Sequence, residues 1–279
     1  MSKTACSLDF EGNTVDGLSS HAIPSTTFSG AKSQSNRHSI YNTLVALLFT
    51  GTSGFAYPTW KPDFYPEKLA QKKFLNFYAT RLNAVEINYT FRRLPSASTL
   101  EGWISATPSD FVFVLKAHQR ITHFDRLETT EFSQVFFNSI DVLRIQKRLG
   151  PVLFQLPPNL PIDLAKLETF LASKPTDIPC AFEFRNKSWL VEDTFQLLEK
   201  HRTALCLAES EKLTVPERIT ADYVYFRLRK PEYSADEVAG IAARVREMIG
   251  GGKDVYVFFK HEDTPAGALC AERLRTLCA

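Results

Sequence analysis

The sequence predicts an α/β protein, most simply a TIM-type (β/α) barrel that forms a single domain. Short apolar runs of strand length recur from residue 45 to the C-terminus, and amphipathic stretches of helical length separate most of them. Most of these runs end in a charged or amide side chain. A strand buried on both faces carries such a residue only where its polar group has a hydrogen-bond or ion-pair partner or a function. Eight strands alternating with about seven helices indicate a parallel sheet.

The predicted strands lie at residues 45–50, 84–88, 111–115, 151–155, 180–184, 204–208, 223–228 and 255–259. Bounds are predicted for six of the helices, at 66–81, 131–149, 164–172, 189–201, 235–249 and 266–277. Pro66 begins the first helix, and Gly150 is typical of the residue that stops the second. Between 209 and 222 there is little room for a helix, because Pro216 interrupts the segment. A doubly wound open sheet is the alternative, but the turn GTSGFAY does not have the dinucleotide-binding pattern GxGxxG.

Composition limits the class of protein. The chain has 279 residues, 44% of them hydrophobic, which suits one barrel or two smaller domains. Its net charge of +2 does not support a strongly basic nucleic-acid binder. No apolar run approaches the roughly 18 residues that cross a bilayer, so we expect no membrane partner. Five widely spaced cysteines without a CxxC pair predict reduced thiols and a cytoplasmic location.

Residues 1–40 differ from the rest of the chain. They are rich in Ser, Thr, Gly and Asn and have no sustained apolar periodicity. Such a segment buries too little apolar surface to offset its ordering entropy. We therefore expect a disordered extension at 1–40 and the barrel domain at 41–279, with a docked arm as the alternative.

A series of motifs runs between residues 51 and 275: GTSGFAYPTW, FYPEKL, VEIN, TFRRLP, LKAHQRITHFDRL, LGPVLFQLPPNL, FEFRNKSW and VFFKHED. Their order and spacing resemble the YecE-like family, catalogued as domain of unknown function 72. The resemblance implies a TIM-type barrel and supplies no reaction. This chain departs from the family where Arg92 replaces a frequent Tyr, Asn186 a frequent His, Arg229–Lys230 a His-Gly pair, and Lys260–His261 two Asn. All four departures lie near the expected site.

The working face of a TIM-type barrel is the C-terminal end of its strands. Because side chains alternate along a strand, eight polar residues are predicted to point inward there. They are Glu86, Asn88, Lys116, Gln155, Glu183, Arg185, Glu209 and Arg227. Glu86 and Glu183 are candidates for general acid and base, with Glu209 as a third catalytic carboxylate. Lys116 and Arg185 are expected to stabilise negative charge, and a buried salt-bridge network is the structural alternative.

His123, in the motif ITH, is the best candidate among the histidines for proton transfer, with a helix-capping role as the alternative. A Schiff-base role for Lys116 is disfavoured, because a neighbouring carboxylate would keep the ammonium charged. A divalent metal is a further alternative, with ligands drawn from Glu86, His123, Glu183, Glu209 and His261. No HExxH or HxH motif occurs, so no metal or cofactor is predicted.

Cationic residues follow the last two predicted strands, where TIM barrels often bind phosphate. They are Arg227, Arg229, Lys230, Lys260 and His261. Aromatic loop residues near the same end are expected to stack on a sugar or base: Tyr57, Trp60, Phe91 and Trp189. Packing of the loop is the better interpretation for Trp189. The glycines at 250–252 are a helix stop at the opposite end of the barrel.

Asn88, Gln155 and Arg185 complete the predicted ligand-binding set. The leading hypothesis is an enzyme, a hydrolase or an isomerase or lyase, that uses carboxylate acid–base chemistry. Its substrate would be polar and anionic, such as a sugar phosphate or a nucleotide. The alternatives are a nucleic-acid-binding or nucleic-acid-processing barrel and a non-catalytic small-molecule binding protein.

Overall fold

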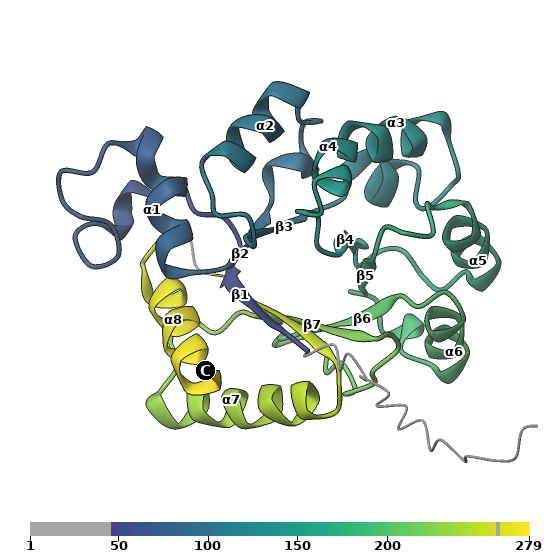
Figure 1. The fold of residues 1–279 in the computed structure, drawn as a ribbon. Helices are drawn as coiled ribbons and strands as arrows, with labels where there is room; N and C mark the ends of the chain where they lie inside the picture. Colours follow the sequence, from purple (N-terminus) through teal and green to yellow (C-terminus); the bar gives the residue numbers. More distant parts are fainter. Residues whose placement is uncertain (1–45, 261–262) are drawn as a thin grey trace, which may run out of the picture. The chain divides into compact units, whose positions relative to one another are not determined.

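The computed structural model describes residues 46–260 and 263–279, and the predicted extension lies outside them. All eight predicted strands are present, with boundaries shifted by up to three residues (Figure 1). They are β1 (Leu48–Thr52), β2 (Ala84–Ile87), β3 (Val112–Leu115), β4 (Val152–Gln155), β5 (Cys180–Glu183), β6 (Ala204–Ala208), β7 (Tyr223–Leu228) and β8 (Asp254–Phe259). Helices follow most strands, so the predicted α/β class is confirmed.

The α-helices of the described residues are α1 (Phe74–Arg81), α2 (Ala97–Ser105), α3 (Glu131–Ser139), α4 (Asp141–Ile145), α5 (Leu164–Ser173), α6 (Glu192–Lys200), α7 (Ala235–Gly250) and α8 (Ala266–Cys278). Short helical turns are η1 (Pro58–Trp60), η2 (Gln71–Lys73), η3 (Tyr89–Phe91), the π-helical η4 (Arg120–Phe124) and η5 (Lys187–Trp189). None of the described helices is both long and apolar enough to cross a membrane.

Three helix predictions need correction. The helix predicted at 66–81 begins only at Phe74, and the helix predicted at 189–201 begins at Glu192. The helix predicted at 131–149 is broken at Ile140, whose ψ of 2° is not helical. It ends at Ile145, because Lys147 takes a positive φ of 55° that L-residues rarely adopt. The helix α2 was not predicted.

All strand pairs are parallel. A six-stranded ladder has the order β1-β8-β7-β6-β5-β4, and β2 pairs with β3 in a second ladder. Two further connections join the ladders: Gly54 N–H donates to Glu86 O at 2.8 Å, and Ala117 N–H donates to Leu153 O at 2.9 Å. The result is a curled parallel sheet with the helices on its outer side (Figure 1).

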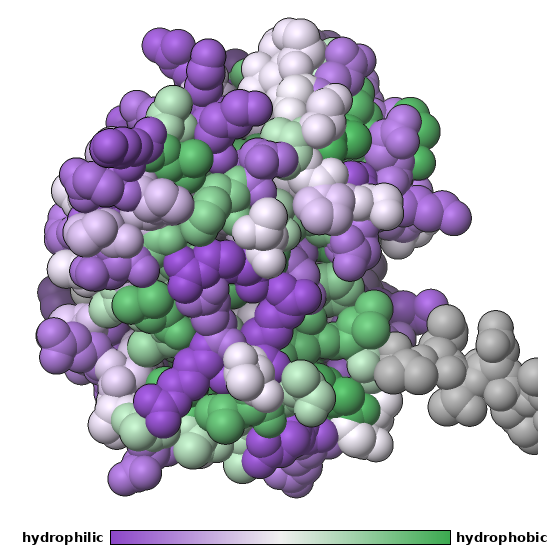
Figure 2. Space-filling view, turned by 60° about the vertical axis from the view of Figure 1, so that its left-hand side comes forward, coloured by the Kyte–Doolittle hydropathy of each residue, from purple (hydrophilic) through white to green (hydrophobic). Residues whose placement is uncertain are grey.

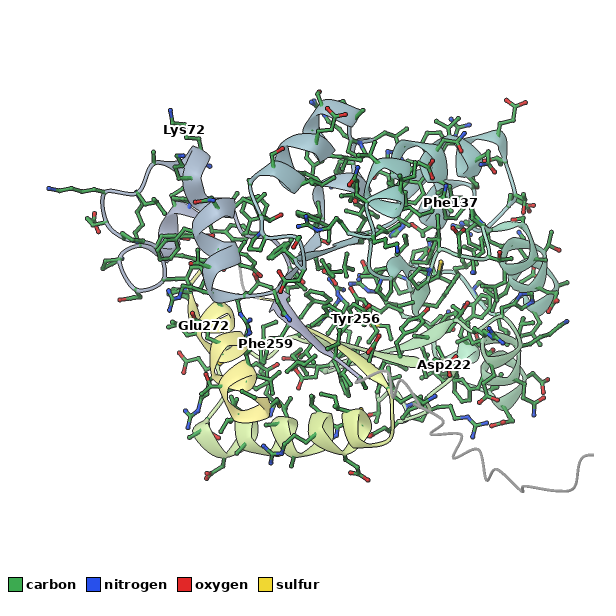
Figure 3. The ribbon with its side chains drawn as sticks, viewed as in Figure 1. Lys72, Phe137, Asp222, Tyr256, Phe259 and Glu272 are labelled. Atoms are coloured by element: carbon green, nitrogen blue, oxygen red, sulfur yellow. The ribbon has the colours of Figure 1, made fainter. Side chains whose placement is uncertain are left out.

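Two apolar clusters fill the domain on opposite faces of the sheet. Tyr256 belongs to an inner cluster enclosed by the strands, whereas Phe259 belongs to the outer cluster between the strands and the helices (Figure 3). The other buried members of the inner cluster are Ala84, Val114, Leu153, Ala181, Ala204, Cys206, Ala208, Tyr225 and Phe258. The alternation of side chains along each strand therefore decides which residues reach the inner face.

All strands point the same way, so their C-terminal ends meet at one end of the curled sheet, here called the mouth. Gly51 allows a close approach that positions this end. A Cβ atom at residue 51 would lie 1.9 Å from Ala84 O, so β1 reaches its neighbour only because residue 51 has no side chain. Two residues later, Ser53 delivers its side chain to the site.

Candidate functional site

Three buried charges form the floor of the mouth. Arg227, on β7, donates from Nε and Nη2 to the two carboxylate oxygens of Glu86, at 2.9 and 2.7 Å. Its Nη1 donates to Glu183 Oε2 at 2.5 Å. Arg227 and Glu183 are each 2% exposed and Glu86 is 0% exposed. We call these three residues the floor cluster.

Two neutral residues complete the floor cluster's hydrogen bonding. The Ser53 hydroxyl donates to Glu86 Oε1 at 2.7 Å, and the Tyr225 hydroxyl donates to Glu86 Oε2 at 2.7 Å. Ser53 directly follows β1, two residues after Gly51, and Tyr225 lies on an inward position of β7, two residues before Arg227. The sequence analysis did not include them. Strand alternation was the signal that could have found Tyr225, because it shares a face with Arg227.

The electrostatics of the floor cluster do not favour the predicted acid–base roles. Burial raises the pKa of Glu86, but the charge and hydrogen bonds of Arg227 outweigh it and hold that pKa below its usual value. For Glu183, burial also raises the pKa, and three arginines together lower it to about 2. Both carboxylates are therefore ionised at neutral pH and have little affinity for a proton. Their geometry matches the structural alternative, in which they hold arginines in place.

Lys116 lies above the floor cluster at the end of β3. Its Nζ donates to Gln155 Oε1 at 2.8 Å, and Gln155 Nε2 donates to Glu183 Oε2 at 2.8 Å. The amide of Gln155 is thus orientated by Glu183 and offers its oxygen to the lysine. Lys116 Nζ also lies 4.0 Å from the centroid of the Phe91 ring. The amine contacts an amide oxygen and an aromatic face. None of its described hydrogen bonds goes to a carboxylate, although the sequence analysis expected one beside it.

A cavity of about 390 Å³ opens above these residues. It is lined by Asn88, Phe91, Arg92, Lys116, Gln155, Arg185, Arg227, Arg229 and Lys260. Six of these nine residues are Lys or Arg, and none is Asp or Glu. The structure therefore brings together most of the predicted binding residues in one cavity, which we call the mouth cavity.

The upper part of the mouth cavity is formed by Arg92, Arg185, Arg229 and Lys260, here called the rim. Arg185 Nε and Arg229 Nη2 donate to Glu183 Oε1 at 3.1 and 2.9 Å. The Arg185 side chain is 37% exposed, and Lys260 is exposed. Within the described part of the chain, no carboxylate forms an ion pair with Arg92 or Lys260. The four cationic side chains of the rim thus outnumber the one carboxylate that pairs with them, that of Glu183.

Figure 2 shows the face toward which the β1 arrow points in Figure 1. Strongly hydrophilic residues lie across the centre of this face, with hydrophobic residues beside them. Polar and charged side chains thus gather on the side of the domain at which the strands end.

His123 lies beside the mouth cavity. Its ring meets Phe91 edge to face, with centroids 5.1 Å apart, and its Nδ1 is 2.8 Å from the Thr122 hydroxyl. Burial first, and then the charges of Lys116 and Arg185, lower the pKa of His123. The ring is therefore neutral at pH 7. The neighbouring His118 accepts from Arg120 N–H at 3.1 Å through its Nδ1, at the start of η4.

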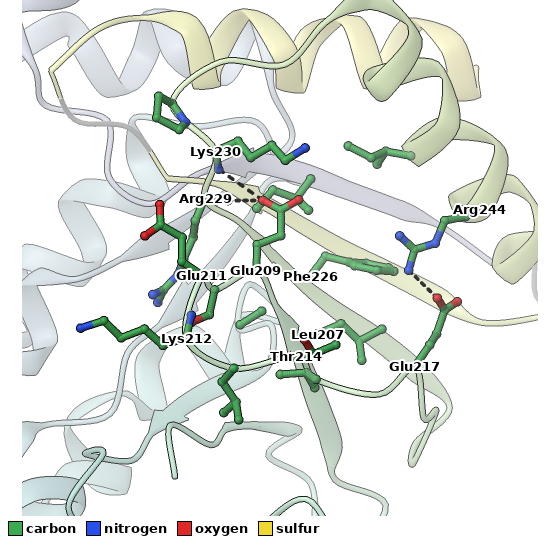
Figure 4. A pocket seen from close by; sticks show the side chains of 17 residues that line it. Leu207, Glu209, Glu211, Lys212, Thr214, Glu217, Phe226, Arg229, Lys230 and Arg244 are labelled. Atoms are coloured by element: carbon green, nitrogen blue, oxygen red, sulfur yellow. Dashed lines mark hydrogen bonds and ion pairs between the residues drawn. The ribbon is translucent and has the colours of Figure 1, made fainter. Parts of the chain in front are cut away.

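Glu209 does not join the floor cluster, which corrects its predicted inward position. The inner positions of β6 are Ala204, Cys206 and Ala208, so residue 209 has the opposite orientation. Its Oε2 accepts from Arg229 N–H at 2.6 Å and from Lys230 N–H at 3.3 Å (Figure 4). Glu209 lines a separate outer groove of about 680 Å³ beside the segment 209–217. Its role is to fix the backbone that carries the rim residue Arg229.

Two of the predicted stacking residues are buried in loop packing. Trp60 is 0% exposed and packs edge to face on Phe64. Trp189 is 1% exposed, donates from Nε1 to Leu160 O at 2.9 Å and stacks on Phe184. Neither ring is presented to a ligand, and Tyr57 donates its hydroxyl to Ser53 O at 3.1 Å. Phe91 is the one predicted stacking residue that lines the mouth cavity.

The described residues that were predicted as ligands of a divalent metal are not grouped around one point. Glu209 lies apart, the oxygens of Glu86 and Glu183 accept from arginines, and His261 lies outside the described residues. Across residues 46–260 and 263–279, no three His, Cys, Asp or Glu side chains are grouped to hold a metal ion.

Residues 49–279 match the family described as "Protein of unknown function DUF72". UPF0759 protein YunF of Bacillus subtilis (strain 168) is 34% identical over 132 residues, which span 45% of this chain and 47% of that relative. A DUF72 family protein of Thermotoga maritima MSB8 is 28% identical, with a TM-score of 0.74 over 83% of this chain and 98% of the other. One from Enterococcus faecalis V583 is 19% identical, with a TM-score of 0.70 over 83% and 95%.

Proposed function

The chain belongs to the DUF72 family, and from this premise we propose that it binds a small phosphorylated or carboxylated ligand in the mouth cavity. The observation that carries this proposal is the cavity lining, in which six of nine side chains are cationic and none is acidic. A concave site with convergent charges of one sign attracts ions of the opposite sign.

The geometry of the arginines supports an anionic ligand. The floor cluster fixes Arg227, and Glu183 holds Arg185 and Arg229 from below. A guanidinium has five N–H donors in a planar fork, a shape that matches carboxylate and phosphate. Arg185 uses Nε on Glu183, lines the mouth cavity and is more than a third exposed, so a ligand in the cavity can reach it. Restrained donors lose little conformational freedom when they bind.

The hydrogen bonds between the two ladders support closure of the eight strands into a TIM-type barrel. In such a barrel the mouth cavity lies where TIM-barrel enzymes place their sites, with Arg227 near the end of β7, Arg229 just after β7 and Lys260 just after β8. A cavity in this position favours the interpretation that the protein is an enzyme acting on the bound anion. Stacking on nucleic-acid bases has less support, because Trp60 and Trp189 are buried.

Thermal denaturation in phosphate and in chloride, at matched ionic strength, tests the proposal. A dissociation constant of about 1 mM would stabilise the protein by about 2 kcal/mol at roughly 50 mM phosphate. For a domain of this size we expect Tm to rise by about 4–8 °C. Equal Tm values in the two salts, together with no heat of phosphate binding in calorimetry, would overturn the proposal.

Arg185→Ala provides the matched test of location. We expect it to remove most of the phosphate-specific rise in Tm, because Arg185 is an exposed fork at the cavity. Arg218→Ala is the control, since Arg218 has 42% of its side chain exposed, pairs with Glu192 and Glu199 and is not part of the mouth cavity lining. An equal loss in both variants would mean that phosphate acts on the surface in general.

A further inference from the structure

Lys116 has an environment that its role as a counter-ion does not explain. Four charged groups lie close enough to influence it: Glu86, Glu183, Arg185 and Arg227. Both carboxylates already accept hydrogen bonds from arginines. The described hydrogen bond of Lys116 Nζ goes to the neutral oxygen of Gln155. The ammonium is therefore partly buried among guanidinium groups without a carboxylate of its own.

The backbone of Lys116 is held from both sides. Its N–H donates to Ile87 O at 3.1 Å, and its carbonyl accepts from the Thr90 hydroxyl at 2.6 Å. An isolated parallel bridge links residue 116 to Leu153. The amine is thus presented to the mouth cavity from a fixed base, between the Phe91 ring and the Gln155 amide.

These surroundings favour the neutral amine. Burial first, and then the charge of Arg227, lower the pKa of Lys116 to about 8, although both carboxylates oppose this. A lysine of this kind has far more free amine at neutral pH than an ordinary surface lysine. A desolvated lysine next to cationic groups is one of the arrangements that activates an amine for covalent chemistry.

We propose that Lys116 Nζ is a nucleophile that forms an imine with the aldehyde or ketone group of a small ligand, whose anionic group is bound at the rim. This inference rests on the proposed anion-binding function. The lone pair of Nζ forms a bond to the carbonyl carbon, and the C=O π electrons move to oxygen. After proton transfer from nitrogen to oxygen, the carbinolamine loses one water and a C=N bond remains. No oxidant or reductant is required.

His123 is placed to assist the proton transfers. Its neutral ring packs on Phe91, the same ring that lies beneath Lys116 Nζ. A neutral imidazole can accept a proton from the attacking nitrogen and return it to the departing hydroxyl. The two residues come from β3 and the following η4 turn, so one stretch of chain supplies both groups.

Reductive trapping tests the proposal. The full chain is incubated at pH 7 with glyoxylate, which carries an aldehyde and a carboxylate, and cyanoborohydride reduces any imine to a stable amine. Peptide mass spectrometry then compares Lys116 with the exposed Lys68 and Lys187. We expect roughly tenfold or greater preference for Lys116. Labelling should fall when phosphate competes, and Lys116→Arg should lose the label.

The result separates the two proposals. If phosphate binds but Lys116 is labelled no more than Lys68 and Lys187, the imine proposal is overturned and the anion site stands. If phosphate neither binds nor protects, the anion site fails. Preferential labelling of Lys116 without phosphate protection would overturn the placement of the ligand's anionic group at the rim.

Discussion

Arg227 at the floor of the mouth is 2% exposed and lies between two carboxylates, whereas Arg185 at the rim has 37% of its side chain exposed and shares one carboxylate with Arg229. The floor cluster holds one arginine against two carboxylates, whereas the rim holds four cationic residues. Breaking a buried pair leaves an unpaired charge in a low-dielectric interior, which costs far more than the loss of a solvent-exposed charge. We therefore infer that the floor determines stability and that the rim determines binding.

The largest effect is expected at the floor. Arg227→Met should lower the free energy of unfolding by about 3–5 kcal/mol, because Glu86 and Glu183 lose their shared partner. Tm should fall by roughly 6–20 °C. Arg227 also lines the mouth cavity, so its predicted contact with the ligand stays a prediction. Arg218→Met on the outer surface is the control, and an equally small change in both variants would contradict a buried ion-paired floor.

The pH dependence of stability should also come from the floor. The folded pKa of Glu183 is about 2, below the unfolded value near 4.5. Its contribution is therefore fully present above pH 4.5 and is lost as pH falls from 4.5 through 2. This loss amounts to roughly 3 kcal/mol. Denaturant titrations across that range measure it, and the slope should be smaller in Glu183→Gln.

Glu183→Gln should change stability and phosphate binding in opposite directions. Gln is nearly isosteric but does not compensate Arg185, Arg227 and Arg229, so the free energy of unfolding should fall by about 1–3 kcal/mol. The rim becomes more positive, so phosphate affinity should rise. Calorimetric titration with phosphate checks the second effect. A variant that is both less stable and weaker in phosphate binding would show that Glu183 positions the rim more than it neutralises it.

The smallest change in stability is expected at the rim. Lys260→Ala should alter the free energy of unfolding by no more than about 0.5 kcal/mol, because the side chain is exposed. Phosphate affinity should still fall roughly two- to fivefold. Lys187→Ala, at an exposed lysine outside the mouth cavity lining, should leave both quantities unchanged.

Alternation along strands predicted the contents of the mouth well. Glu86, Lys116, Gln155, Glu183 and Arg227 meet as expected, because each occupies the inward position at the end of its strand. The period-2 rule succeeds where the strand boundary is clear.

Glu209 shows where that rule fails. The run ALCLAE is apolar at every position up to residue 208, so no change in polarity marks which face is inward. A one-residue error in such a strand reverses the face. For Trp60 and Trp189, topology predicted the correct end of the sheet, but it does not distinguish a ring that faces the opening from one packed beneath a loop.

The helix errors have similar causes. The sequence has no Pro or Gly near Ile140 that would predict the break between α3 and α4. The start of α2 depends on the Ser96 hydroxyl, which accepts from Thr99 N–H at 3.2 Å. Serine occurs so often in turns that this cap is a weak signal without the structure.

The buried floor affects how a ligand enters and leaves the mouth cavity. Phe258 lies beside Arg227, and Tyr225 and Tyr256 lie below it, all 9% exposed or less, so these described side chains close the inner face beneath the floor cluster. A molecule in the mouth cavity would therefore exchange with solvent on the side of the rim. A product of a reaction there would pass the same rim arginines that bind the substrate, and a slowly departing product would act as a competitive inhibitor.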